Sequence, residues 1–183
     1  MVHGPEFYNR RKGFEFGRKK GEPKTIPGVK VENRVGVQAP ASAVWDVLRD
    51  VDAWPAWNPL YTKVAGMMRI GEHLILTRAV PGRAEETLDT TVLDWTPNEL
   101  LHARRTLLGG LVASVCYWEI DVLDEEASIF SNGELFMGLL ASWHVRRARR
   151  ALRQGYALMG EALKARVEAQ WRDRAGSPTS VGS

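Results

Sequence analysis

The chain has 183 residues, 44% of them hydrophobic and 26% charged, with a net charge of +3. This composition fits one ordinary globular domain and excludes a fibrous or wholly disordered protein. The single cysteine, Cys116, excludes an intramolecular disulfide framework, and no stretch approaches the roughly 20 apolar residues needed to cross a bilayer, so we expect a cytoplasmic protein.

Basic residues concentrate at the start of the chain. Residues 1–30 hold eight lysines and arginines against three acidic residues, a net of +5, so the remainder is slightly acidic. We expect residues 1–29 to form a basic, flexible N-terminal extension, either a solvated leader or an arm that contacts an acidic partner, nucleic acid or lipid headgroups. Residues 30–170 then form the folded domain, and residues 171–183 a disordered tail.

The folded part begins with a strand and a broken helix. Valines alternate with polar residues in 29–38, which predicts a strand. Pro40 suits the first turn of a helix, and apolar residues then recur at helical spacing. This helix must end before Pro55, so we expect a second short helical turn at 53–57, at an angle to the first.

The middle of the chain alternates with a period of two between turn signals, which predicts an antiparallel meander. After Gly138 the period changes to 3.6, and apolar residues from Val145 to Val167 predict one long amphipathic helix. We therefore expect an α+β fold: a curved, seven-stranded antiparallel sheet with two short helices and the long helix across its concave face. The six strands expected after the short helices are residues 61–64, 73–79, 85–95, 100–108, 112–123 and 128–136.

Three stretches carry a family resemblance: APASAVWDVLRDVDAWPAWNPL, YWEIDVLDEEASIFSNGELFMGLL and RRARRALRQGYALMGEALKARVEA. They resemble the polyketide cyclase/dehydrase and lipid-transport (SRPBCC) family of the START/Bet v 1-like superfamily, from about Val31 to Glu168. The resemblance implies a helix-grip fold that encloses a cavity. It also implies binding of a hydrophobic or aromatic small molecule, lipid- or polyketide-like, with a polyketide aromatase/cyclase or dehydratase as the alternative. A third possibility is an interaction module that works through the basic arm.

Alternation assigns the side chains of the strand at 112–123 to two faces. The apolar set faces the interior, and the polar set between them is expected to face solvent. The inward set is Cys116, Trp118, Ile120 and Val122, and the outward set is Tyr117, Glu119 and Asp121.

The strand at 128–136 places polar groups on the buried face. Asn132 and Glu134 lie between Phe130 and Phe136 in the same alternating set. An isolated buried carboxylate is costly. Glu134 is therefore expected either to pair with an inward arginine, such as Arg105, or to serve as a polar anchor or general acid in the cavity.

The expected cavity wall comes from the short helix, the sheet and the long helix. The catalytic candidates are Glu134, Asn132 and Tyr156, but these residues do not decide between an enzyme and a carrier. The resemblance implies that relatives often have histidine at the positions of Cys116 and Asn132, so the obvious proton-transfer groups are missing here. The predicted ligand-binding residues are Trp57, Tyr61, Leu88, Val92, Cys116, Trp118, Asn132, Glu134, Phe136, Tyr156 and Met159.

Other motifs point to no further chemistry. His73, His102 and His144 lack the spacing of metal ligands, so neither a metal nor a cofactor is expected. The arginine run at 146–153 is expected to be a solvated helix face, which makes nucleic acid an unlikely partner. A hydrophobic small molecule is the expected partner, and the protein is either a monomer or a homodimer.

Overall fold

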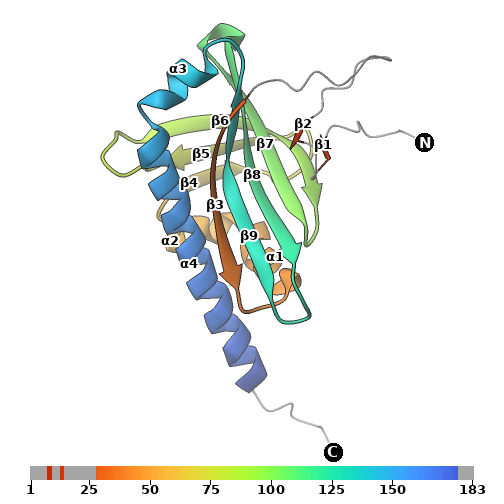
Figure 1. The fold of residues 1–183 in the computed structure, drawn as a ribbon. Coiled ribbons are helices and arrows are strands. Elements are labelled where there is room, and N and C mark those ends of the chain that lie inside the picture. Colours follow the sequence, from red (N-terminus) through yellow and green to blue (C-terminus); the bar gives the residue numbers. More distant parts are fainter. Residues whose placement is uncertain (1–7, 10–12, 15–27, 177–183) are drawn as a thin grey trace, which may run out of the picture.

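The computed structural model describes residues 8–9, 13–14 and 28–176. Seven antiparallel strands form one curved sheet in the order β3-β9-β8-β7-β6-β5-β4 (Figure 1). A separate pair, β1 (Tyr8–Asn9) and β2 (Gly13–Phe14), lies within the expected N-terminal extension, most of which is outside the described residues. The strands of the large sheet are β3 (Gly28–Val37), β4 (Tyr61–Gly66), β5 (His73–Arg78), β6 (Glu86–Thr96), β7 (Leu100–Leu107), β8 (Val112–Val122) and β9 (Ser128–Met137).

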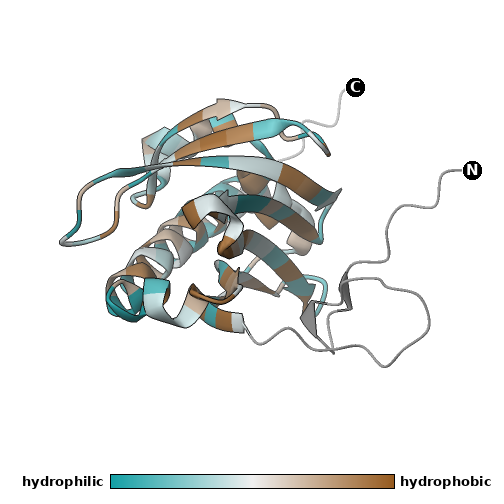
Figure 2. Ribbon diagram, turned by 90° about the horizontal axis from the view of Figure 1, so that it is seen from above, coloured by the Kyte–Doolittle hydropathy of each residue, from teal (hydrophilic) through white to brown (hydrophobic). Residues whose placement is uncertain are grey.

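The helices are placed as the expected α+β fold requires. The long helix α4 packs against β3 and β9 on the concave face, and buries the apolar stripe that predicted it. Figure 2 looks down on this arrangement and shows hydrophobic and hydrophilic positions alternating along the strands. The helical segments are α1 (Ala41–Arg49), η1 (Val51–Ala53), α2 (Trp54–Trp57), η2 (Leu108–Gly110), α3 (Ala141–Arg146) and α4 (Arg149–Gly176).

The break between α1 and α2 is held by two side chains. Trp54 is fully buried, and its indole N–H donates to the carbonyl of Leu48 at 2.9 Å, which ties the second helix to the end of the first. Asn58 ends α2, because its Oδ1 accepts the backbone N–H groups of Leu60 (2.9 Å) and Tyr61 (3.1 Å). The predicted second helical turn is therefore confirmed, and the chain leaves it directly into β4.

The C-terminal helix differs from the expected single element. The short helix α3 packs on the ends of β3, β8 and β9, and a turn at Arg147–Ala148 separates it from α4. Neither residue is a helix breaker, so the sequence carries no local signal for this turn. At the other end, α4 continues to Gly176, past the boundary at residue 170 that was expected for the domain.

Two residues of β8 differ from the predicted exposure. Val122, expected inward, is 67% exposed, because it is the last residue of the strand and lies beyond the packed interior. Tyr117, expected to face solvent, is only 5% exposed. Its hydroxyl donates to Glu32 Oε2 at 2.9 Å, and the Lys30 ammonium lies 5.0 Å from the ring centre, so the outer face of the sheet holds it in place.

The turn from β9 to α3 generates a stability prediction. Gly138 has φ +109°, and a Cβ there would lie 2.5 Å from the carbonyl oxygen of Leu111. Gly138→Ala should therefore lower the free energy of unfolding by about 2 kcal/mol or more, through strain and a backbone clash. Gly36→Ala is the matched control, because nothing lies within 4 Å of its Cβ position. Equal chemical-denaturation midpoints for the two variants would contradict the geometry of this turn.

Candidate functional site: a polar network beneath an aromatic cluster

A buried carboxylate lies at the centre of the concave face. Glu134, on β9, is fully buried. Arg78 from β5 donates to its Oε2 at 2.5 Å, and Arg105 from β7 donates to its Oε1 through Nε (3.3 Å) and Nη2 (3.2 Å). Ser114 Oγ donates to Oε1 at 2.6 Å, and the Tyr156 hydroxyl of α4 donates to Oε2 at 3.1 Å. The expected pair with Arg105 is thus confirmed, as part of a larger network.

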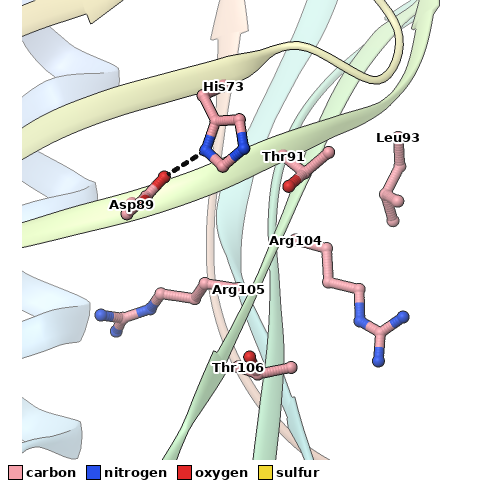
Figure 3. A pocket seen from close by; sticks show the side chains of 7 residues that line it. All are labelled: His73, Asp89, Thr91, Leu93, Arg104, Arg105 and Thr106. Carbon is pink, nitrogen blue, oxygen red and sulfur yellow. Dashed lines mark hydrogen bonds and ion pairs between the residues drawn. The ribbon is translucent and has the colours of Figure 1, made fainter.

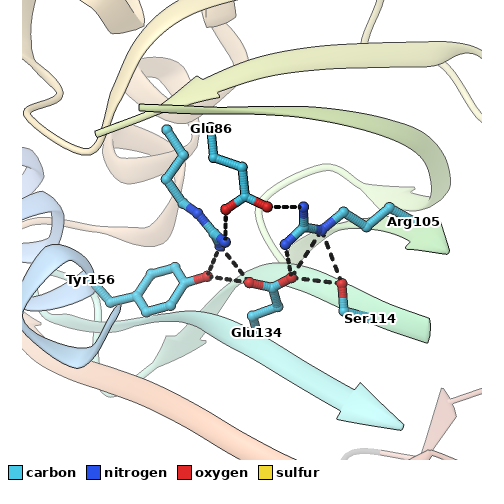
Figure 4. A network of polar contacts seen from close by, with 6 residues as sticks. Glu86, Arg105, Ser114, Glu134 and Tyr156 are labelled. Atoms are coloured by element: carbon cyan, nitrogen blue, oxygen red, sulfur yellow. Dashed lines mark hydrogen bonds and ion pairs between the residues drawn. The ribbon is translucent and has the colours of Figure 1, made fainter. Parts of the chain in front are cut away.

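A second carboxylate lies on the other side of the two arginines. Glu86 accepts from Arg78 Nη2 at 2.8 Å and from Arg105 Nη1 at 2.7 Å (Figure 4). Its side chain is 43% exposed, whereas those of both arginines are at most 5% exposed. Two cations are therefore balanced by two anions, and Glu86 is the end of the network that reaches the surface.

The network fixes the ionisation of its members. Burial alone would raise the pKa of Glu134, but the charges of Arg78 and Arg105, with the hydrogen bond from Ser114, hold it at about 2. Glu134 is consequently an anion at neutral pH, which disfavours it as a general acid. Burial raises the pKa of Cys116 to about 12, so its thiol stays protonated and is a poor nucleophile.

Above the network lies a cluster of aromatic rings. Trp54 and Trp118 have ring centres 5.4 Å apart, and Tyr61 lies 5.8 Å from each of them. Burial strongly raises the pKa of Tyr61 and of Tyr156, so both phenols keep their protons. These edge-on and tilted contacts make a rigid aromatic wall at one end of the interior.

Several polar atoms near this wall have no hydrogen-bond partner among the described residues. They are the indole N–H groups of Trp57 and Trp118, the Tyr61 hydroxyl, the Asn58 side-chain amide nitrogen and Arg78 Nε. Buried polar groups are almost always hydrogen-bonded in folded proteins. Donors without an acceptor, set in an apolar wall, are suited to a ligand that carries oxygen atoms.

The predicted site residues are, with one exception, buried in the interior that holds these two features. Asn132 is occupied in joining helix to sheet: its Nδ2 donates to the carbonyl of Tyr156 at 3.0 Å and its Oδ1 accepts from Asn33 at 3.3 Å. Trp57 is only half-buried, and Trp54 takes the central place in the cluster. The others are all buried: Tyr61, Leu88, Val92, Cys116, Trp118, Asn132, Glu134, Phe136, Tyr156 and Met159.

Four residues of this region were not predicted from the sequence: Arg78, Glu86, Ser114 and Trp54. Strand alternation could have found three of them. Arg78 shares a face with the buried Leu76, Glu86 with Leu88, and Ser114 with Cys116. The same period of two that placed Glu134 inward also applies to them.

A hollow of about 510 Å³ lies over β5, β6 and β7, apart from the predicted wall. Figure 3 shows Arg104 and Arg105 pointing to opposite sides of β7, with His73 and Asp89 close together. The His73 and Asp89 side chains pair at 2.7 Å on the exposed surface. No group of His, Cys, Asp and Glu side chains in the described part of the chain could hold a metal ion. The lining residues are His73, Asp89, Thr91, Leu93, Arg104, Arg105 and Thr106.

The sequence matches the family described as "Polyketide cyclase / dehydrase and lipid transport" over residues 28–172, and the chain belongs to this family. The fold is the helix-grip fold, which the similar solved structures share. A search of curated proteins finds no match.

Similar solved structures support the fold assignment. The Zhui aromatase/cyclase from Streptomyces sp. R1128 is 22% identical, with a TM-score of 0.65 over 82% of this chain and 100% of its own. A norcoclaurine synthase from Thalictrum flavum is 14% identical, with a TM-score of 0.61 over 80% and 98%. A START superfamily protein from Mycobacterium smegmatis is 17% identical, with a TM-score of 0.60 over 77% and 98%.

The network predicts a large and pH-dependent contribution of Glu134 to stability. Glu134→Gln leaves two buried arginines facing a neutral amide, so the free energy of unfolding should fall by about 3–5 kcal/mol. Because the folded-state pKa lies below the unfolded value, wild-type stability should fall as the pH drops from about 4.5 towards 2. Urea unfolding of both proteins across this range would measure the two effects.

Asp89→Asn provides the matched control for this measurement. It removes the charge from an exposed pair with His73, so the change in stability should stay within about 0.5 kcal/mol. The variant Glu134→Gln should also show a shallower pH dependence than the wild type, with Glu86 supplying what remains. A neutral effect of Glu134→Gln would mean that the arginines do not depend on this carboxylate.

Proposed function

We propose that the protein binds a hydrophobic or aromatic small molecule, lipid- or polyketide-like, between the aromatic wall and helix α4. The observation that carries the proposal is the set of buried donors without acceptors, at Trp57, Trp118 and Tyr61. A flat ring system would pack on Trp118, and oxygen atoms on its edge would accept from the indole and the phenol. Membership of a family described by polyketide cyclisation and lipid transport supports this ligand class.

A polyketide aromatase/cyclase or dehydratase activity in the same interior is the second candidate. The likeness to the Zhui aromatase/cyclase, which extends over that whole chain, favours it. Tyr61 is the proton donor best suited to polarise a substrate carbonyl, because burial keeps its phenol protonated. The Tyr156 hydroxyl is also protonated, but it already donates to Glu134. Glu134 and Asn132 are then supporting groups, since the arginines and the backbone of α4 occupy them.

The carrier function predicts binding at a single site. Anilinonaphthalene sulfonate should bind the native protein with one-to-one stoichiometry, and anthraquinone should displace it, because both fit an aromatic wall. Fluorescence titration measures both steps. Absence of saturable binding of either compound to the native protein would reject the proposal. Cyclisation of a poly-β-keto thioester, followed by mass spectrometry and lost in Tyr61→Phe, would instead favour the enzyme.

The buried donors predict which feature of the ligand is recognised. Tyr61→Phe removes only the hydroxyl, so affinity for anthraquinone should fall about five- to tenfold, the equivalent of one hydrogen bond. Affinity for anthracene, which has the same shape without oxygen atoms, should not change. Tyr117→Phe is the matched control, because the Tyr117 hydroxyl bonds to Glu32 on the outer face. An equal loss for both ligands would indicate lost packing instead of a lost donor.

A further inference from the structure

One end of the molecule exposes a group of large apolar side chains. Leu139 is 89% exposed and Trp143 is 66% exposed, at the turn into α3 and within it. Leu108 and Leu111 are each 46% exposed, at the η2 turn between β7 and β8. The two turns are joined, because the backbone N–H of Leu140 donates to the Leu111 carbonyl at 3.4 Å, and Figure 1 shows them at the same end of the sheet. These four residues are the apolar tip.

The apolar tip contains a leucine with an unfavourable backbone conformation. Leu108 has φ +51°, a conformation that L residues other than asparagine and aspartate adopt rarely. The two residues that follow it are glycines, also at positive φ. An exposed leucine is thus kept at a position where glycine or asparagine would be less strained and more soluble.

A group of arginines adjoins the apolar tip. Within the described part of the chain, none of the five forms an ion pair, and all are exposed. Residues 135–160 contain no aspartate or glutamate, so nothing on this segment neutralises them. We call Arg146, Arg147, Arg149, Arg150 and Arg153 the arginine belt.

Three residues of the arginine belt are placed where they oppose helix stability. Arg149, Arg150 and Arg153 lie in the first turns of α4, and this first turn has no acidic residue. The N-terminus of a helix carries a partial positive charge, so cations there are unfavourable. The remainder of α4 mixes both signs, as in the Lys164–Glu168 pair. A role outside folding accounts for these three unpaired arginines at the electrostatically unfavourable end of α4.

Charge decides among the partners that could cover this surface. A second copy of the chain, related by a two-fold axis, would bring one arginine belt against another, and the basic residues 1–30 carry the same sign. Nucleic acid would match the charge but offers no apolar layer for Leu139 and Trp143. An anionic lipid surface offers both, with headgroups for the arginines and acyl chains for the apolar tip.

We infer that the apolar tip and the arginine belt together form a docking surface for an anionic lipid bilayer. No helix in residues 28–176 is long and apolar enough to span a membrane, so the contact is peripheral. The Arg83 side chain, in the turn between β5 and β6, donates to the Arg147 carbonyl at 3.4 Å. This contact places the turn before Glu86 next to the arginine belt.

Vesicle sedimentation with the full chain tests the inference. The wild type should bind vesicles of phosphatidylcholine containing about one third phosphatidylglycerol, and should bind pure phosphatidylcholine at least about tenfold more weakly. Binding should weaken as salt rises. The variant pair Arg149→Glu/Arg150→Glu should lose at least about tenfold in affinity, and Leu139→Ser/Trp143→Ser should also bind clearly more weakly.

The matched control is Arg166→Glu/Arg172→Glu, which makes the same charge change on the distant half of α4 and should bind like the wild type. Arg149→Glu/Arg150→Glu should keep or raise the melting temperature, because glutamates suit a helix N-terminus, so unfolding cannot explain its loss.

Three outcomes would overturn the inference. The first is a wild type that does not distinguish anionic from neutral vesicles, and the second is equal weakening in the control variant. The third is unchanged vesicle binding by Leu139→Ser/Trp143→Ser together with equally tight binding of duplex DNA by the wild type, which would mean a general polyanion site.

Discussion

The buried charge of Glu134 constrains the rest of the interior. A carboxylate without solvent must find cations and donors, and here they come from four other elements: β5, β7, β8 and α4. Each contact also fixes a distance between elements, so the curvature of the sheet and the position of the helix depend on one anion. Asn132 adds a second link, between β9 and the backbone of α4.

The polar groups of the interior fall into two classes. Those around Glu134 bond to one another, with two arginines shared between Glu134 and Glu86, and Arg78 Nε is the one donor of this group without a partner among the described residues. Such a network specifies structure, and replacing one of its charged members leaves the opposite charge without its full complement of partners. The donors of Trp118, Trp57 and Tyr61 belong to the other class, since they lie in an apolar wall without partners among the described residues. This separation explains how a strongly charged interior can still suit a hydrophobic ligand.

Much of the fold followed from periodicity, because one face of each strand and one stripe of the helix are buried. The period of two placed Cys116, Trp118 and Glu134 inward, and the period of 3.6 placed Tyr156 on the buried stripe of α4. Periodicity failed at Val122, where the strand outruns the core, and at the turn between α3 and α4, which packing produces without a helix-breaking residue.

Long-range pairing was harder to predict than burial. Arg105 could be predicted as a partner of Glu134, because its strand lies close to β9 in the sheet and its side chain points inward. Arg78 could not, because its contact with Glu134 requires the sheet to curve until β5 faces β9. For a similar reason, the sequence predicted Trp57 at the place in the interior that Trp54 occupies. The angle between α1 and α2 decides which of the two indoles enters the core. This angle is set by the hydrogen bond from Trp54 to the Leu48 carbonyl, which the sequence pattern does not predict.

The most direct test of the account follows the indole N–H resonances by nuclear magnetic resonance during titration with anthraquinone. The signals of Trp118 and Trp57 should move downfield as their unpartnered N–H groups find an acceptor. The signal of Trp54 should stay in place, because its N–H already bonds to Leu48. Unmoved Trp118 and Trp57 signals at saturation, or shifts confined to the surface Trp95 and Trp143, would contradict a ligand site in the interior.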